Sequence, residues 1–357
     1  MTIIKHQWGS LSISWGERAK CEDYEGKAMD KHPPTVYVTR RIPQVGLEKM
    51  RAACEVNLWD GELPPPKDVI LRQVAGCQGL VCLLSDPIDE GVIAAAPQLR
   101  AISQYAVGVD NIALGAATAR GIPVGHTPGV LTNATADLAF TLLMAAARRI
   151  PEGIETVKEG RWQTWEPLGL LGADVWGATL GIVGLGRIGT AMARRARGFD
   201  MRVIYHSRSR KPTLETELGL EYAATVGHLL PEVDFLSLHC PLTPETEGMI
   251  DADALRRMKP TAILVNTSRG QVVDTGALLQ ALRQGWIAAA ALDVTDPEPL
   301  PGDHPLLDLP NCLVVPHIGS ATVSTRERMS VITAENLLAG LRGEPMPHCA
   351  NPQVYER

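Results

Sequence analysis

The chain of 357 residues lacks any long uninterrupted apolar run, and this excludes a membrane-spanning protein. No apolar stretch reaches the roughly eighteen residues that a helix needs to cross a bilayer. Residues 1–20 also lack the continuous apolar core of a secretory signal. We therefore expect neither a membrane segment nor export.

An excess of positive charge is missing too. Lys and Arg total 34 against 40 Asp and Glu, so the formal net charge is −6 and the sequence pI about 5.9. Such a chain has no basic surface for a nucleic-acid backbone. Its hydrophobic content of 45% and charged content of 21% are typical of a soluble globular protein, and the length allows two ordinary domains. We expect neither nucleic acid nor a membrane as partner.

Paired cysteines are also lacking. The Cys77–Cys82 pair has no second pair or histidine cluster to complete a zinc site, so no metal is predicted. Reduced thiols in a cytoplasmic enzyme are the simplest interpretation. The seven cysteines, odd in number and scattered, are Cys21, Cys54, Cys77, Cys82, Cys240, Cys312 and Cys349.

Residues 1–34 differ in composition from the rest. Residues 17–34 are polar, with charges of both signs and no periodicity. We interpret 1–34 as a poorly ordered leader, with Met29 as a candidate alternative start, and favour a floppy terminus over a functional arm.

An alternation of strand and helix patterns begins at Thr35. A long helix is predicted over 133–150, with Asn133 as N-cap; apolar residues on most of its faces indicate a spine buried between domains. The tail 324–343 predicts a second long helix that ends at Gly343. The other elements predicted here are strands over 36–39 and 79–84, a strand running into a glycine turn over 99–110, and a helix around 44–53.

The segment 178–210 supplies a strand, a glycine turn, a helix and a second strand in order. Gly184, Gly186 and Gly189 form G-x-G-x-x-G directly after an apolar strand. The first permits a tight turn, the second lets a pyrophosphate approach, and the third lets the helix pack close. Flavin and S-adenosylmethionine proteins use similar turns, but this context favours a dinucleotide.

The end of the second strand bears on which dinucleotide is bound. Residues 205–211 hold no acid for a ribose 2′-hydroxyl but contain three cations and two hydroxyls, which suit a 2′-phosphate. A solvated basic loop is the alternative. We predict a preference for NADP(H), with NAD(H) possible, resting on Ser207, Arg208 and Arg210.

Three later apolar runs each end in a turn that carries one ionisable group. Arg269 follows the run in 262–270, Glu298 the run in 288–299, and His317 the run in 311–319. Parallel strands place such ends at one edge, where ligands bind. Singly, Arg269 as a helix cap, Glu298 as a solvated acid and His317 as a core histidine are reasonable. Together they can hold an α-keto acid and protonate its carbonyl, so a reductase is the leading hypothesis.

The motifs along the chain match a known family. They are AVGVDNI (106–112), GLGRIG (184–189), HCPLTPET (239–246), NTSRGQVVD (266–274), ALDVTDPEP (291–299) and PHIGSAT (316–322). From about Pro34 to Pro347 the chain resembles the D-isomer-specific 2-hydroxyacid dehydrogenases. Segments 126–139, 157–168 and 337–347 are most similar to the glyoxylate/hydroxypyruvate reductases among them. Asp137, where Glu is commoner, is a slight departure.

The resemblance implies an α/β fold with two Rossmann-like lobes, doubly wound parallel sheets and an active site in the inter-lobe cleft. Residues 35–130 with 323–357 would form the substrate-binding domain, and 131–322 the NAD(P)-binding domain. The crevice would close on substrate and exclude water. Residues 1–34 have no clear counterpart.

It also implies roles. Arg269 would grip the substrate carboxylate and C2 oxygen, with the backbone amides of Val107 and Gly108. His317 would donate a proton to the substrate carbonyl, and Glu298 would orient its imidazole. The implied cofactor contacts are Thr135, Gly184, Gly186, Arg187, Ile188, Gly189, Ser207, Arg208, Arg210, Cys240, Pro241, Thr246, Thr267, Ser268, Asp293, His317 and Gly319.

Other histidines compete poorly as the acid. None of His126, His206, His239 and His304 has a paired carboxylate at a suitable strand end. Trp165 lies in a region that forms a dimerisation arm in the resembling reductases, where an aromatic reaches the partner's active site. We predict a homodimer with Trp165 as a substrate contact; filling a gap behind the long helix is the alternative.

The predicted activity is NADPH-preferring reduction of small 2-keto acids, glyoxylate to glycolate and hydroxypyruvate to D-glycerate. Two alternatives stay open. One is a related dehydrogenase for D-lactate, D-glycerate 3-phosphate or phosphite, although 106–112 supplies no basic residue for a phosphorylated substrate. The other is a corepressor-like protein that senses the dinucleotide and binds partner peptides.

Overall fold

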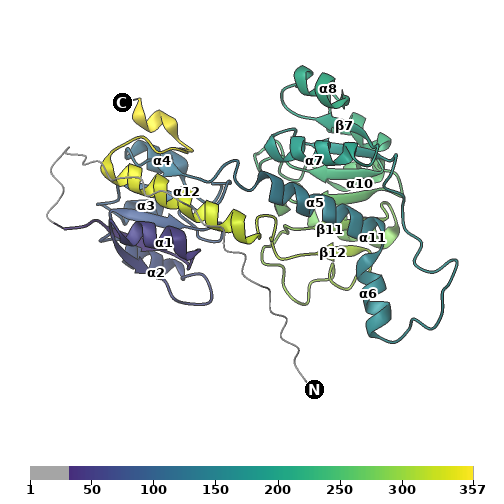
Figure 1. The fold of residues 1–357 in the computed structure, drawn as a ribbon, viewed down its shortest axis with the longest axis horizontal. Helices are drawn as coiled ribbons and strands as arrows, with labels where there is room; N and C mark the ends of the chain where they lie inside the picture. Colours follow the sequence, from purple (N-terminus) through teal and green to yellow (C-terminus); the bar gives the residue numbers. More distant parts are fainter. Residues whose placement is uncertain (1–31, 357) are drawn as a thin grey trace, which may run out of the picture. The chain divides into compact units, whose positions relative to one another are not determined.

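A computed structural model describes residues 32–356 (Figure 1). The compact unit begins at Pro34. The predicted leader, 1–34, lies outside the described residues as far as residue 31. The domain limits predicted at 131 and 323 stay predictions.

The N-terminal part of this unit is built on a five-stranded sheet. All neighbouring strands are parallel, in the order β2-β1-β3-β4-β5. β1, β3 and β4 are largely buried, as parallel strands covered on both faces must be. The strands are β1 (Thr35–Val38), β2 (Glu55–Leu58), β3 (Gly79–Cys82), β4 (Ala101–Gln104) and β5 (Val124–Gly125); the helices between them are α1 (Gln44–Arg51), α2 (Lys67–Val74), α3 (Glu90–Ala94) and α4 (Leu114–Ala119).

The C-terminal helix α12 (Val323–Arg342) packs against α1, β3 and β4 of this sheet, as its yellow ribbon shows (Figure 1). The Thr322 side chain caps its first turn by accepting from the N–H of Thr325. Gly343, at φ 74°, ends it in the left-handed conformation that favours glycine. The predicted long helix and its glycine stop are confirmed. The chain ends in the short helix η3 (Pro352–Tyr355).

A second sheet of seven parallel strands follows, in the order β12-β11-β10-β9-β6-β7-β8. The order reverses between β6 and β9, and ligands of such sheets bind outside the carboxyl ends of the strands at that point. The predicted doubly wound α/β fold is confirmed. The strands are β6 (Thr179–Val183), β7 (Arg202–His206), β8 (Leu220–Tyr222), β9 (Phe235–Leu238), β10 (Ile263–Asn266), β11 (Ala289–Leu292) and β12 (Cys312–Val314).

The long helix preceding this sheet is shorter than predicted. It runs from Thr132 to Ala147 and packs against α7, β10 and β11, so it covers a face of the seven-stranded sheet. Asn133 lies inside it and is not its N-cap. Arg149, at φ 51°, breaks the helix, and Pro151 lies in the first turn of a new one. The helices here are α5 (Thr132–Ala147), α6 (Ile150–Lys158), α7 (Arg187–Arg197), α8 (Pro212–Leu218), α9 (Val226–Leu229), η1 (Leu230–Glu232), α10 (Ala252–Arg257), η2 (Gly270–Val272) and α11 (Thr275–Gln284).

Within residues 32–356, no helix is both long and apolar enough to span a membrane. Over the same residues, no group of three or more His, Cys, Asp or Glu side chains is arranged to hold a metal ion. The cytoplasmic location stays a prediction.

Candidate active site

The glycine turn after β6 has the geometry that a bound pyrophosphate requires. Gly184 has φ 97°, and a Cβ there would lie 2.6 Å from the backbone nitrogen of Cys240. A Cβ on Gly189 would lie 2.2 Å from the Gly184 oxygen, so α7 packs directly on the turn. A Cβ on Gly186 would meet nothing within 4 Å, which leaves open space at the start of α7. Each glycine therefore fits the part predicted for it, and the turn fits a dinucleotide.

In the basic segment after β7, one of the predicted phosphate contacts, Arg210, is engaged in an ion pair. Arg210 donates to Glu215 from Nε at 2.9 Å and from a terminal nitrogen at 2.8 Å. Glu215 also accepts from the Tyr205 hydroxyl at 2.6 Å. Arg208 faces the loop after β9: a hydrogen bond from Thr243 lowers the pKa of Glu245, and the charge of Arg208 adds to this effect. Of the two arginines predicted to contact a 2′-phosphate, Arg210 is thus the one already paired with a carboxylate.

His239, in the loop after β9, lies between two hydroxyl groups. Its Nε2 is 2.9 Å from the Ser237 hydroxyl, and its Nδ1 is 3.4 Å from that of Thr267 after β10. Burial lowers the pKa of His239 to about 4, so the ring is neutral at pH 7. The same loop is closed by the Thr246 hydroxyl, which donates to the Pro241 carbonyl at 2.7 Å.

Asp293, directly after β11, lies next to two other residues that were predicted to contact the cofactor. Its carboxylate accepts from the N–H of Ile318 at 2.6 Å and of Gly319 at 2.9 Å. Burial raises the pKa of Asp293, although these two N–H groups oppose the shift. A Cβ on Gly319 would lie 2.9 Å from Asp293 and 3.3 Å from Thr135 of α5. Asp293, Gly319 and Thr135 therefore lie together, although they come from the loops after β11 and β12 and from α5.

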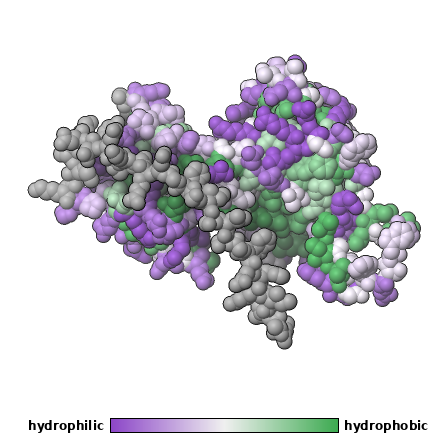
Figure 2. Space-filling view, in the orientation of Figure 1, coloured by the Kyte–Doolittle hydropathy of each residue, from purple (hydrophilic) through white to green (hydrophobic). Residues whose placement is uncertain are grey.

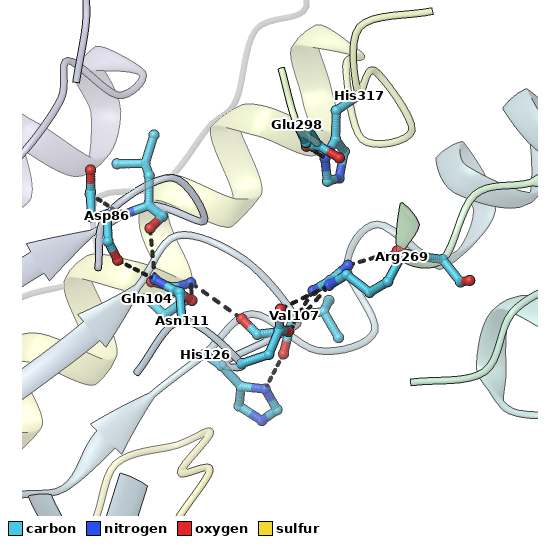
Figure 3. Close-up of polar contacts among 12 residues, drawn as sticks. Asp86, Gln104, Val107, Asn111, His126, Arg269, Glu298 and His317 are labelled. Atoms are coloured by element: carbon cyan, nitrogen blue, oxygen red, sulfur yellow. Dashed lines mark hydrogen bonds and ion pairs between the residues drawn. The ribbon is translucent and has the colours of Figure 1, made fainter. Parts of the chain in front are cut away.

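His317 and Glu298 form a hydrogen-bonded pair, with 2.6 Å between Nδ1 and Oε1 (Figure 3). Burial raises the pKa of Glu298, but the hydrogen bond and charge of His317 outweigh it, and the net shift is downward. An ionised carboxylate can only accept, so Nδ1 carries the hydrogen and Nε2 faces away from Glu298. The His317 side chain is 30% exposed, which leaves it accessible to a substrate.

The backbone of His317 is held in an uncommon conformation. Its φ is 51°, in the left-handed region that a residue with a side chain seldom adopts. Its N–H donates to the Asp293 oxygen at 2.9 Å and to the Val315 oxygen at 3.0 Å, which fixes this turn. Such strain is concentrated at functional sites.

Arg269 reaches from the end of β10 to the loop after β4 (Figure 3). Its guanidinium donates to the Asp110 carboxylate at 3.0 to 3.2 Å and to the Ser268 carbonyl at 2.8 Å. A Cβ on Gly108 would lie 1.7 Å from one terminal nitrogen of Arg269, so the guanidinium lies directly against this glycine. The structure thus brings Arg269 to the predicted carboxylate-binding loop.

The charges of Arg269 and His317 act on two neighbouring carboxyl groups, those of Asp110 and Glu298. Burial raises the pKa of Asp110, but its hydrogen bonds with Arg269 and the charges of Arg269 and His317 lower it overall. The charge of Arg269 is likewise among the weaker causes that lower the pKa of Glu298. Arg269, Glu298 and His317 therefore form one electrostatic cluster with Asp110.

Two further residues, Trp165 and Asp110, bear on the predicted site. Trp165 lies on the segment after α6 with 80% of its surface exposed, and within the described part of the chain no hydrogen bond or ring contact joins it to the site residues. Its contact with a partner's site stays a prediction. The ion pair of Asp110 with Arg269 does not follow from the sequence, in which the only signal is a carboxylate two positions after a glycine.

Comparison with known proteins agrees with this geometry. The model of the D-isomer specific 2-hydroxyacid dehydrogenase NAD-binding domain matches residues 140–319. The chain belongs to this family. A member of the D-isomer specific 2-hydroxyacid dehydrogenases is an oxidoreductase that binds a nicotinamide dinucleotide, and the glycine turn fits that cofactor.

Individual family members are similar over almost the whole chain. The glyoxylate reductase of Korarchaeum cryptofilum is 56% identical over 90% of this chain and 97% of its own length. The glyoxylate reductase/hydroxypyruvate reductase of Homo sapiens is 51% identical over 87% of this chain and 96% of its own. A solved NADPH-dependent glyoxylate/hydroxypyruvate reductase from Sinorhizobium meliloti, in complex with NADP and malonate, has TM-score 0.80 and 32% identity, and the match covers 90% of this chain and 98% of that one.

Proposed function

We propose that this dehydrogenase reduces glyoxylate to glycolate and hydroxypyruvate to D-glycerate, with NADPH preferred over NADH. One observation carries the proposal: Arg269 lies against Gly108 while His317 is paired with Glu298 in the same electrostatic cluster. That cluster offers a carboxylate clamp and a proton donor together. The names of the archaeal and human relatives support the choice of substrates.

Arg269 would bind the substrate carboxylate through the part of its guanidinium that the protein leaves free. Nε and one terminal nitrogen donate to Asp110, and the other terminal nitrogen donates to Ser268. A guanidinium has five N–H groups, so one on each terminal nitrogen remains for two adjacent oxygens. The backbone amides of Val107 and Gly108 would complete the carboxylate site.

His317 would donate the proton from Nε2 to the C2 oxygen of the substrate. Glu298 accepts a hydrogen bond from the opposite ring nitrogen, which fixes the orientation of the ring. A nicotinamide dinucleotide held at the glycine turn would supply a hydride for C2, so that with the proton from His317 the carbonyl would become an alcohol. His317 is left neutral and regains its proton from water, because its side chain is 30% exposed.

The preference for NADPH would rest on Ser207 and Arg208, with Arg210 held back by Glu215. We expect Arg208→Gln to lower kcat/KM for NADPH about tenfold or more and to leave kcat/KM for NADH within about twofold, since one charged hydrogen bond is worth about 1.5–3 kcal/mol. Arg210→Gln is the matched control and should change the ratio much less. Equal or better use of NADH by the wild-type protein would overturn the preference.

We further propose a homodimer formed through the segment from α6 to residue 177. Figure 2 shows apolar residues, in green, exposed over α6 and the loop that follows it. A soluble monomer seldom exposes so many large apolar side chains together, and such a patch marks an interface. The exposed residues are Ile150, Ile154, Val157, Trp162, Trp165, Leu168, Leu170, Leu171 and Trp176.

Light scattering after size exclusion tests the dimer, with twice the 38.5 kDa of one chain expected. Trp165→Ser should raise KM for glyoxylate if this indole reaches the partner's site, while Trp162→Ser serves as the control on the same segment. An active monomer would contradict both claims.

Initial rates test the proposed reaction itself. Glyoxylate, hydroxypyruvate and pyruvate are each assayed with NADPH and with NADH. Glyoxylate or hydroxypyruvate with NADPH should give the highest kcat/KM. Negligible turnover in all six combinations would refute the proposal. It would favour one of the alternatives, a corepressor-like protein or a phosphite dehydrogenase.

A further inference from the structure

His126 directly follows β5, and its side chain contacts the loop that carries Gly108. Nδ1 of His126 is 2.9 Å from the carbonyl oxygen of Val107 (Figure 3). A carbonyl oxygen can only accept, so Nδ1 carries the hydrogen and donates it. The contact is therefore a hydrogen bond that fixes both the tautomer of the ring and the position of the Val107 carbonyl.

The backbone of His126 is itself held firmly. Its N–H donates to the His348 carbonyl at 3.1 Å, and its carbonyl accepts from the Asn336 side chain of α12 at 2.8 Å. The same fully buried Asn336 accepts from the N–H of His348 at 3.0 Å. A Cβ on Gly125 would lie 2.6 Å from Asn336, so β5 packs tightly on α12. The backbone that carries the imidazole is thus fixed by hydrogen bonds and by the packing of β5 on α12.

This hydrogen bond acts on the peptide unit that joins Val107 to Gly108. A trans peptide is planar, so its N–H points away from its C=O. With the Val107 carbonyl held by His126, the Gly108 N–H must point away from His126. The next carbonyl, that of Gly108, accepts from the buried Gln104 side chain at 3.3 Å.

Both carbonyls around Gly108 are therefore held by side chains at the ends of β4 and β5. Within residues 32–356, the N–H groups of Val107 and Gly108 donate to no protein group. Arg269 lies against the same glycine. Two free amide donors and a guanidinium together suit a carboxylate.

We propose that His126 is a positioning residue for the substrate carboxylate. Its hydrogen bond to Val107 orients and polarises the Val107–Gly108 peptide, so that the Gly108 N–H donates to the carboxylate held by Arg269. It acts on substrate binding and has no part in proton or hydride transfer. This inference rests on the proposed function, because it concerns the carboxylate site of that reaction.

Steady-state kinetics of three proteins test the role. His126→Leu keeps the approximate size of the side chain and removes the donor, whereas His126→Asn can donate from a similar place. At saturating NADPH, His126→Leu should raise KM for glyoxylate about 3- to 10-fold, as the loss of one hydrogen bond predicts. His126→Asn should stay within about twofold of the wild type. kcat and KM for NADPH should stay within about twofold in both variants.

A structural role would give a different pattern, which thermal unfolding of each variant helps to identify. An unchanged KM for glyoxylate in His126→Leu would overturn the proposal, as would an equal rise in His126→Asn or a fall in kcat alone. If His126→Leu does not fold, His126→Ala carries the same expectation. Absence of glyoxylate reduction by the wild-type protein would instead refute the proposed function, and this result is obtained first and separately.

Discussion

The carboxyl edges of the two sheets present different chemistry. After β10, β11 and β12 of the seven-stranded sheet come Arg269, Glu298 and His317, whose side chains ionise. After β4 of the five-stranded sheet comes a loop that offers peptide N–H groups, and its carboxylate, Asp110, is already bonded to Arg269. In the proposed function, the edge of the seven-stranded sheet supplies the reactive groups and the edge of the five-stranded sheet supplies a fixed binding surface. Substitutions at the seven-stranded edge should change kcat most, and those at the five-stranded edge should change KM.

The largest effect is expected at His317. His317→Ala removes the proposed proton donor, so kcat for glyoxylate should fall about 10²- to 10⁴-fold. The dissociation constant of NADPH, measured by fluorescence, should stay within about threefold. His228→Ala, at an exposed histidine of α9, is the control and should keep full activity. Unchanged turnover in His317→Ala would refute its role as the acid.

The second largest effect is expected for Arg269→Lys. Lysine keeps the charge but cannot hold Asp110, Ser268 and two substrate oxygens at once, so kcat/KM for glyoxylate should fall about 10- to 100-fold. Arg72→Lys, at an exposed pair on α2, controls for the substitution itself. A decrease in kcat/KM of less than about twofold would contradict the assignment of Arg269 to the carboxylate site.

Gly108→Ala tests the five-stranded edge directly. The new Cβ would lie 1.7 Å from a guanidinium nitrogen, so Arg269 must move. KM for glyoxylate should rise about tenfold or more, equivalent to one charged hydrogen bond, with a smaller change in kcat. Gly115→Ala on α4, where a Cβ would meet nothing within 4 Å, should leave both constants unchanged. A change in kcat alone would contradict the division between the two edges.

The last prediction concerns stability and pH, with the smallest expected effect on activity. Burial lowers the pKa of His239 from 6.5 to about 4, so the unfolded chain binds the proton more readily between these values. Stability should therefore decline as pH falls from about 6.5 to about 4, by up to about 3 kcal/mol from this group. Urea unfolding of wild type and His239→Asn at pH 7 and 4.5 measures it. An identical pH dependence in the two proteins would contradict the assignment.

The sequence predicted those parts of the fold that depend on local pattern. The glycine turn at 184–189 and the end of α12 at Gly343 each require a backbone or packing that glycine favours, and both occur as predicted. The end of α5 did not follow from apolar periodicity, because Arg149 turns the chain although the pattern continues to Ile150. Periodicity reports burial and does not report where a backbone turns.

The same limit applies to the site. Arg269, Glu298 and His317 were recognisable because an ionisable residue after a buried strand is unusual. The contacts of His126 and Asp110 depend on pairing between residues 19 and 159 positions apart, which a single sequence does not reveal. The ion pair between Arg210 and Glu215 could likewise not be predicted from the sequence, because it depends on the positions of both side chains.

The arrangement as a whole is tested most directly by the chirality of one product. If Arg269 and the 106–110 loop fix the carboxylate while His317 protonates the C2 oxygen, hydride can reach only one face of the substrate. Hydroxypyruvate reduced by the wild-type protein with NADPH should therefore give D-glycerate alone, as resolved by chiral chromatography. A racemic product would contradict a site in which these groups act together, and L-glycerate alone would contradict the proposed D-glycerate product.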